Sequence, residues 1–75
     1  LQNGDFIIWH ENGQKDLDMT FKDGRQHGLL IEWHENGKKK TERNYNNGKE
    51  HGLVLEWNED GKKTFEGNFV DGNEQ

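Results

Sequence analysis

The chain contains neither cysteine nor serine in its 75 residues. Without cysteine, a disulfide framework and a thiolate metal site are both excluded. Without serine as well, a hydroxyl nucleophile has to come from Thr20, Thr41 or Thr64. The longest apolar runs are three or four residues, far too short to cross a bilayer or to form the core of a signal peptide. These absences leave few routes to catalysis or to membrane insertion.

Basic and strongly apolar residues are also scarce. The chain has 15 acidic and 10 basic residues, for a net charge of −5, which disfavours nucleic acid and anionic membranes as partners. Leu, Ile, Val and Phe together make up 15 of the 75 residues, close to the composition of disordered chains. We expect one small domain over residues 1–75. The first residue is Leu1 rather than Met, which is compatible with excision from a longer repeat protein.

An internal repeat outweighs this composition. Shifting the sequence by 24 residues aligns three copies without insertion or deletion, at 3–26, 27–50 and 51–74. Six columns are identical in all copies: Gly4/Gly28/Gly52, Trp9/Trp33/Trp57, Glu11/Glu35/Glu59, Gly13/Gly37/Gly61, Lys15/Lys39/Lys63 and Gly24/Gly48/Gly72. The chain is therefore one supersecondary unit written three times.

Each unit reads as a β-hairpin. Two glycine turns per copy leave room for two strands of about six residues, and apolar residues recur with a period of two. No window of a dozen residues is free of glycine, which argues against helices. The sequence predicts an all-β fold, in which three stacked hairpins form a single twisted antiparallel meander without a helix.

The turns set the expected register. A three-residue loop ending in Gly37 would place Trp33 opposite Lys39 and Ile31 opposite Thr41, so that odd-numbered residues share one face. The register glycines are Gly13, Gly24, Gly37, Gly48, Gly61 and Gly72.

The second turn is expected to behave in the same way. If Asn46-Asn47-Gly48 is also a three-residue loop, Lys39 faces Leu55, and each repeat slides by two residues against the last. The sheet would then be staggered as well as twisted.

The stretches "FKDGRQHG", "WHENGK" and "YNNGKEHG" resemble the MORN repeat, in the bacterial variant found among YwqK-type antitoxin proteins. The resemblance implies stacked hairpins in an elongated, curved single sheet with an aromatic-lined groove, and a scaffolding or dimerisation role. The matching positions are Phe21, Gly24, His27, Gly28, Trp33, Gly37, Tyr45, Gly48, His51, Gly52, Trp57 and Gly61. The first copy departs from the pattern with Asn3 where the others have histidine.

Catalytic and metal sites have little support in this pattern. The columns His10/His34 and His27/His51 repeat every two strands, ~10 Å, too far apart for two ligands of one metal. The carboxylates of Asp18, Glu42 and Glu66, flanked by Glu32 and Glu56, recur in near-identical surroundings, whereas a catalytic site is a single constellation. Single aspartates at Asp23-Gly24 and Asp71-Gly72 are explained by turn geometry rather than by calcium. We therefore expect no enzyme, no metal and no cofactor.

The apolar columns are the strongest functional candidates. A single sheet cannot cover its own apolar face, so a partner segment, another copy or more of the parent protein should lie against it. The candidate interaction face is Ile7, Trp9, Phe21, Ile31, Trp33, Tyr45, Leu55, Trp57 and Phe69.

Three functions follow as hypotheses. The first is a non-catalytic repeat scaffold that binds protein or self-assembles through this face and the open sheet edges, with a homo-oligomer as one form. The second, which the resemblance and the acidic charge suit, is an antitoxin or immunity protein that neutralises a toxin. The third is a module that binds carbohydrate or lipid through its tryptophans. Bacterial cytoplasm and cell envelope both remain open as locations.

Overall fold

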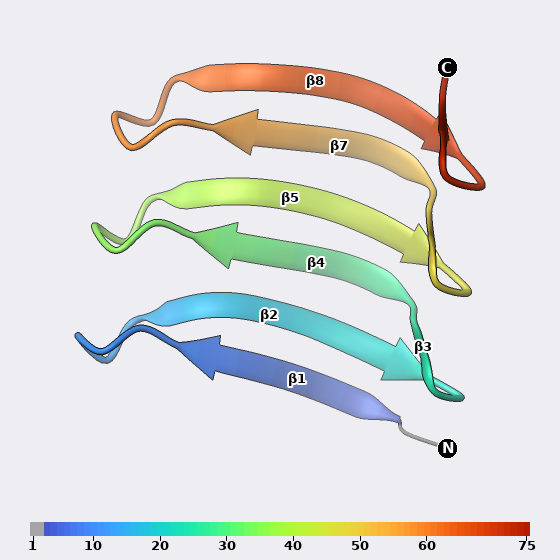
Figure 1. Ribbon diagram of the computed structural model, residues 1–75, viewed down its shortest axis with the longest axis horizontal. Helices are drawn as coiled ribbons and strands as arrows, with labels where there is room; N and C mark the ends of the chain where they lie inside the picture. Colours follow the sequence, from blue (N-terminus) through green and yellow to red (C-terminus); the bar gives the residue numbers. More distant parts are fainter. Residues whose placement is uncertain (1–2) are drawn as a thin grey trace.

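A computed structural model describes residues 3–75, which form one open antiparallel sheet (Figure 1). Three long hairpins make up the body of the sheet: β1 (Gly4–Trp9) with β2 (Lys15–Lys22), β4 (Gly28–Trp33) with β5 (Lys39–Asn46), and β7 (Gly52–Trp57) with β8 (Lys63–Val70). Three two-residue strands complete it: β3 (Arg25–Gln26), β6 (Lys49–Glu50) and β9 (Asn73–Glu74). The predicted all-β meander of hairpin repeats is confirmed.

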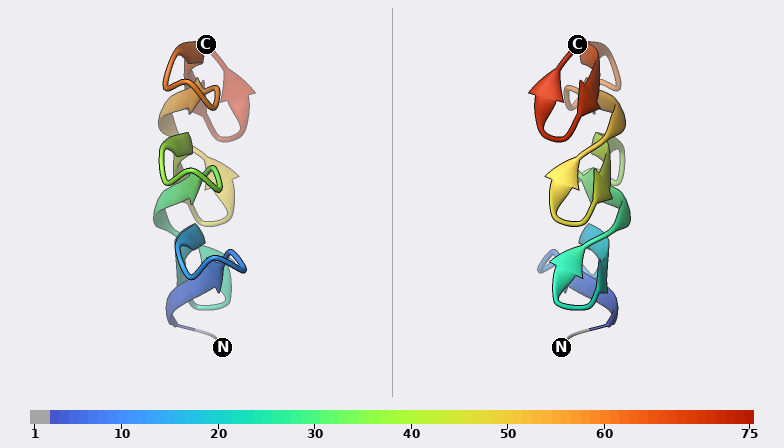
Figure 2. Two further views of the ribbon diagram at one scale, coloured as in Figure 1. Left: turned by 90° about the vertical axis from the view of Figure 1, so that its left-hand side faces the viewer. Right: turned by 90° about the vertical axis from the view of Figure 1, so that its right-hand side faces the viewer.

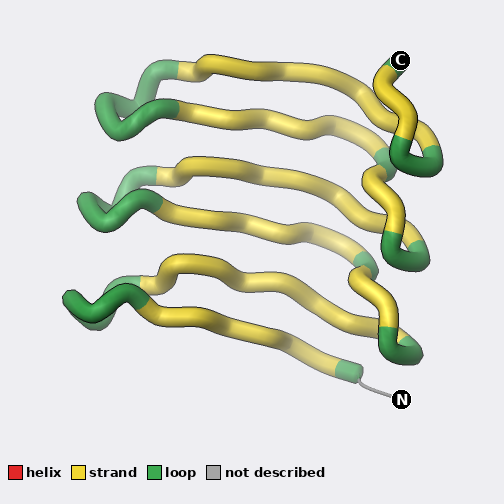
Figure 3. Tube along the Cα trace, in the orientation of Figure 1, coloured by secondary structure: helices red, strands yellow, loops and turns green. Residues whose placement is uncertain are grey.

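Within residues 3–75 the chain has no helix of the length and apolarity needed to cross a bilayer. The three units stack along one direction, with the first and last described residues at opposite ends of the stack (Figure 2). The loops that join the two long strands of each hairpin lie along one lateral edge of the sheet. The turns that lead into the short strands lie along the opposite edge (Figure 3).

The hairpin loop has the predicted length. His34 donates its backbone N–H to Lys38 O at 2.8 Å, and Trp33 pairs with Lys39. Gly37 has φ +87°, the left-handed conformation that closes a three-residue loop after a type I turn. The first-turn register is therefore confirmed as far as the tryptophan.

After the Trp33–Lys39 pair, β5 contains one residue more than the opposing strand β4. Lys40 is bulged out, and Ile31 consequently pairs with Glu42 instead of the predicted Thr41. The same bulge occurs in the other hairpins, at Asp16 and Thr64. Because side chains alternate between faces, one extra residue moves the rest of the strand to the other face. The prediction that all odd-numbered residues share a face is wrong for this reason.

The second turn is shorter than predicted. Asn46 pairs with Lys49, so only Asn47 and Gly48 lie in the loop. Their φ values are +52° and +87°, as a type I′ turn requires at both central positions. The three-residue reading of Asn46-Asn47-Gly48 is therefore wrong.

The repeats do not slide against one another. Glu42 pairs with Ile31 on one side and with Leu55 on the other, and these two residues are equivalent positions of successive copies. Lys39 does not face Leu55, so the predicted two-residue stagger is wrong. Equivalent residues instead form straight rows across the strands.

The core of the described residues is small and lies at the inner strands. Leu30 and Val54 are 6% and 1% exposed, and Thr41 on the neighbouring strand is 4% exposed. Phe6 occupies the same column in the first copy but is 41% exposed, because within residues 3–75 β1 pairs with a strand on one side only. Burial in this fold therefore depends on having a preceding repeat.

Candidate interaction surfaces

The strand pairing defines two faces of the sheet. One carries the buried column, and side chains of β3 and β6 reach onto it; we call it the packed face. Its members include Phe6, Phe21, Leu30, Thr41, Arg43, Tyr45, Val54, Glu56 and Phe69. The opposite one, the open face, comprises Ile7, Asp18, Leu29, Ile31, Glu42, Leu53, Leu55 and Glu66.

The nine residues of the candidate interaction face do not share one side. Tyr45 pairs with Gly28 and so lies on the packed face with Leu30, and its equivalents Phe21 and Phe69 do the same. Ile7, Ile31 and Leu55 lie on the open face. The prediction that all nine share one face is wrong, because the bulge reverses the face of the residues that follow it. Whether either set binds a partner stays a prediction.

The open face carries a row in which apolar and acidic side chains alternate. Across the strands its order is Ile7, Asp18, Ile31, Glu42, Leu55 and Glu66. Beside this row lie the leucines Leu29 and Leu53, which are 42% and 39% exposed. The described part of the chain leaves this apolar stripe uncovered.

Lysines next to the bulge neutralise the acids of this row. Lys15 Nζ lies 3.3 Å from Asp18 Oδ2, and Lys39 and Lys63 make the same contact with Glu42 and Glu66. The Lys15 ammonium also lies over the Trp33 ring of the next repeat, 5.9 Å from its centroid. The inner tryptophan is thus a contact between repeats.

The packed face holds an ion-pair network between repeats. Arg43 donates from Nη1 to Glu50 Oε1 at 2.6 Å and from Nη2 to Glu56 Oε2 at 2.8 Å. Burial lowers the pKa of this guanidinium, but the hydrogen bond to Glu56 and the charge of Glu50 outweigh burial, so the pKa of Arg43 is raised. The raised pKa keeps the guanidinium charged at neutral pH, and Arg43 loses this charge only in strongly alkaline solution. The network is a fixed structural link at neutral pH.

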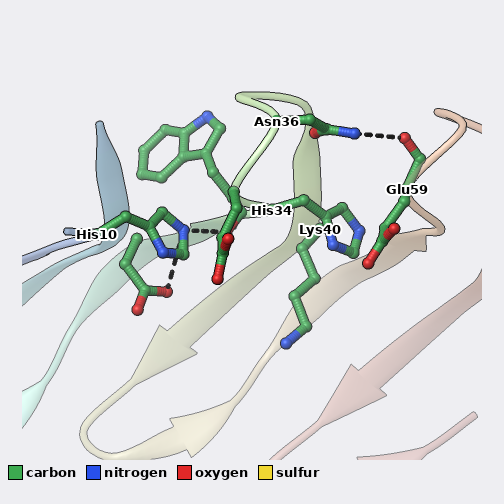
Figure 4. Close-up of a pocket in the computed structure, with 8 residues that line it drawn as sticks. His10, His34, Asn36, Lys40 and Glu59 are labelled. Atoms are coloured by element: carbon green, nitrogen blue, oxygen red, sulfur yellow. Dashed lines mark hydrogen bonds and ion pairs between the residues drawn. The ribbon is translucent and has the colours of Figure 1, made fainter. Parts of the chain in front are cut away.

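The side of the sheet that carries the hairpin loops holds a ladder of side chains (Figure 4). His10 and His34 donate from Nε2 to the backbone oxygens of Trp33 and Trp57, at 3.0 and 2.9 Å. Next to them, Asn12 and Asn36 donate to the backbone oxygens of Glu35 and Glu59, at 2.8 and 2.7 Å. Each repeat thereby binds the backbone of the one that follows, and we call these contacts the loop ladder.

A recess of about 490 Å³ opens between the rungs of this ladder. It is lined by His10, Asp16, Trp33, His34, Glu35, Asn36, Lys40 and Glu59. His10 Nε2 lies 3.9 Å from Asp16 Oδ1, but the same nitrogen is committed to a backbone oxygen. Among the described residues no group of three His, Cys, Asp or Glu side chains could hold a metal ion. The polar groups of the recess serve the stacking of repeats.

The loop ladder was not predicted from the sequence, although the sequence contains a pattern that indicates it. The histidine and asparagine columns recur beside each hairpin loop, and the third copy breaks both, with Asn58 and Asp60 in place of His34 and Asn36. A carboxylate has no hydrogen to donate. The break thus coincides with the described unit that has no following neighbour.

The predicted carboxylate column also divides between the faces. Asp18, Glu42 and Glu66 share the open face, as the alignment of copies indicated. Glu32 and Glu56 lie on the packed face, where Glu56 binds Arg43.

The free edge of β1 is the most exposed apolar segment. All six of its residues are exposed, with Phe6 at 41%, Ile7 at 37%, Ile8 at 42% and Trp9 at 58%. Inside the sheet the equivalent strands β4 and β7 are each paired on both sides.

Comparison with known proteins gives one family. The family model described as MORN repeat variant matches residues 2–23, 26–47 and 50–71, three segments that begin 24 residues apart. Searches of curated proteins and of solved structures find no significant match.

Proposed function

Since this chain belongs to the MORN repeat variant family, we propose that it is a non-catalytic repeat scaffold that binds protein through the open face of its sheet. The observation that carries the proposal is the uncovered apolar stripe. Leu29, Leu53 and Ile7 are each more than a third exposed on a face that no part of the described chain covers. Stripes of this kind on small proteins usually mark contact surfaces.

The charge of the chain indicates the chemistry of its partner. Lysines pair with Asp18, Glu42 and Glu66 on the open face, but the chain as a whole carries a charge of −5. A partner that places apolar side chains on the leucines and carries a basic surface around them would be attracted by this net charge. A toxin with a basic surface is one protein of this kind, so an immunity role is a special case of the proposal.

Stacking of sugars on the tryptophans has less support. The Lys15 ammonium lies over the ring of Trp33, on the surface where a sugar would stack. The inner tryptophan therefore contributes to the contact between repeats rather than to an open platform.

Site-specific photo-cross-linking tests the proposal. A benzophenone side chain placed at Leu29 or Leu53 should yield protein adducts in cells of the source organism, because these positions face the partner directly. The matched control is Lys62, an exposed residue beside the last hairpin loop and outside the described strands. Adducts at Lys62 equal to those at Leu29, or none at either leucine, would contradict a protein-binding open face.

A further inference from the structure

The two internal junctions of the sheet are equivalent. At the first junction, between β2 and β4, Leu17 pairs with Glu32 and Asp18 with Ile31. At the second, between β5 and β7, the equivalent residues pair in the same way, Thr41 with Glu56 and Glu42 with Leu55. A backbone bond repeats too, since Gly48 N–H donates to Gln26 O at 2.8 Å and Gly72 N–H to Glu50 O at 2.9 Å. A junction of this geometry therefore adds one repeat without rearranging its neighbours.

The two free edges of the molecule are the two halves of such a junction. β1 occupies the place of β4 and β7, and its outer edge has no partner strand among the described residues. β8 occupies the place of β2 and β5. Its end is already closed by β9, because Gln75 N–H donates to Asn68 O at 2.8 Å, as His51 does to Asn44. Within residues 3–75 no strand pairs with the outer side of β8 before Asn68, so that this stretch can receive one.

The residues at these edges differ from the inner ones in a matched way. At the inner junction Thr41 pairs with Glu56, and Arg43 binds Glu56 beside it. At the outer edges of the described sheet, Ile8 stands where both inner junctions have a glutamate, and Phe65 stands where they have Leu17 and Thr41. These two apolar residues occupy positions that face each other across a junction.

Gly67 completes the match on the β8 side. It stands where Arg43 stands in the second repeat, and a Cβ added there would lie 2.8 Å from Oε2 of Glu74 and 3.1 Å from Cζ of Phe65. The Phe65 ring therefore leans over the glycine, beside the Glu74 carboxylate. The guanidinium of the ion pair is absent on this edge, just as Ile8 replaces its acidic partner on the other.

From this complementarity we propose that the β8 edge of one copy binds the β1 edge of a second copy, head to tail. In this junction Phe65 pairs with Ile8 and Glu66 with Ile7, which extends the row of the open face from one copy into the next. The apolar segment from Phe6 to Trp9 carries no proline or lysine, the devices that normally protect an edge strand. The proposal rests on the scaffold function and specifies its partner as this chain.

The trans junction lacks the asparagine contact of the loop ladder, which sets its strength below that of an inner junction. Asp60 stands in place of Asn36, and its carboxylate has no hydrogen to donate to the next copy. Head-to-tail contacts do not close on themselves unless they form a ring. The species should therefore grow with concentration in steps of one chain, 8.8 kDa.

Two variants that copy inner residues test the proposal. Ile8→Glu alters the β1 edge and Phe65→Thr alters the β8 edge, and each substitution introduces the residue that an inner repeat tolerates. Measured by light scattering and sedimentation across concentration, each variant should associate ~10-fold more weakly than the unmodified chain, because a polar group loses water without gaining a partner. Circular dichroism melts verify that both variants fold.

Mixing the variants distinguishes head-to-tail binding from any symmetric contact. Ile8→Glu retains an intact β8 edge and Phe65→Thr an intact β1 edge, so the mixture should form one-to-one dimers that grow no further. A third variant, Asp60→Asn, restores a ladder donor and should lengthen the arrays of the otherwise unmodified chain.

Two results would overturn the head-to-tail junction. One is an unmodified chain that stays monomeric at every concentration, and the other is a mixture of folded variants that does not form dimers. Adducts at Leu29 in the cross-linking experiment would still support the protein-binding function in that case. The failure of the junction and the failure of the scaffold are thereby told apart.

Discussion

Asn36 takes part in two hydrogen bonds that do different work. Its Oδ1 accepts the backbone N–H of Lys38 at 3.0 Å and shapes its own loop, while its Nδ2 donates to Glu59 O at 2.7 Å and holds the next repeat. The two roles separate chemically, because a carboxylate of the same shape keeps the first bond and loses the second.

The substitution Asn36→Asp should therefore weaken the link between the second and third repeats without disturbing the loop. We expect a loss of ~1–2 kcal/mol in the free energy of unfolding, because an acceptor then faces another acceptor. Urea unfolding followed by circular dichroism measures it. Asp60→Asn is the control at the equivalent position and should cost nothing. Equal stability of Asn36→Asp and the unmodified chain would show that the ladder does not hold the repeats together.

At the scale of the strand, the bulge decides which side chains meet. Its position follows Lys15, Lys39 and Lys63, yet the bulged residues themselves are Asp16, Lys40 and Thr64, which share no chemistry. No glycine marks the place. The sequence therefore contains the hairpins and their loops but gives no local indication of the bulge, and every face assignment beyond it depended on a residue count.

The second turn was open to prediction. Asp23-Gly24, Asn47-Gly48 and Asp71-Gly72 have the residue pairs that favour a two-residue type I′ loop, and all three have positive φ at both positions. The three-residue reading came from requiring odd residues to share a face, a requirement that the bulge removes. The three hairpins, their order and the first loop needed only glycine spacing and were predicted correctly, whereas the two-residue strands β3, β6 and β9 were not predicted.

Deleting Lys40 should remove the bulge and leave the register beyond it unchanged. Without the bulged residue, Glu32 still meets Thr41 and Ile31 still meets Glu42, so the buried Leu30 column keeps its face. We expect a loss of about 1 kcal/mol or less in the free energy of unfolding in urea. The control Lys40→Thr copies the third repeat and should stay within about 0.5 kcal/mol. A loss of several kcal/mol or of cooperative unfolding on deletion would show that the bulge itself, and not only the register, is required by the fold.

For the whole molecule, stability should rise from the first repeat to the inner ones. Trp9 is 58% exposed, whereas Trp33 is half-buried, receives the Lys15 ammonium over its ring and provides the backbone oxygen that binds His10. In a stacked array each unit is stabilised mainly by its neighbours, and a unit with one neighbour is the weaker.

Trp33→Ala should accordingly lower the free energy of unfolding by roughly 2 kcal/mol, and Trp9→Ala by about 1 kcal/mol or less. Circular dichroism in urea is the suitable probe, since both variants lose a fluorophore. Equal losses would indicate that the first repeat is as well supported as the second. In that case a strand would have to cover the exposed β1 edge even when the chain is studied by itself.

The straight rows of equivalent residues also determine how the molecule responds to force. Because the first and last described residues lie at opposite ends of the stack, tension between them acts along the hydrogen bonds that join the strands (Figure 2). Hydrogen bonds loaded in that direction break one after another, whereas hydrogen bonds loaded in shear break together. Each released repeat of 24 residues adds up to ~80 Å of extended chain. Held between two anchored proteins, this sheet is a tether that lengthens in equal steps at low force.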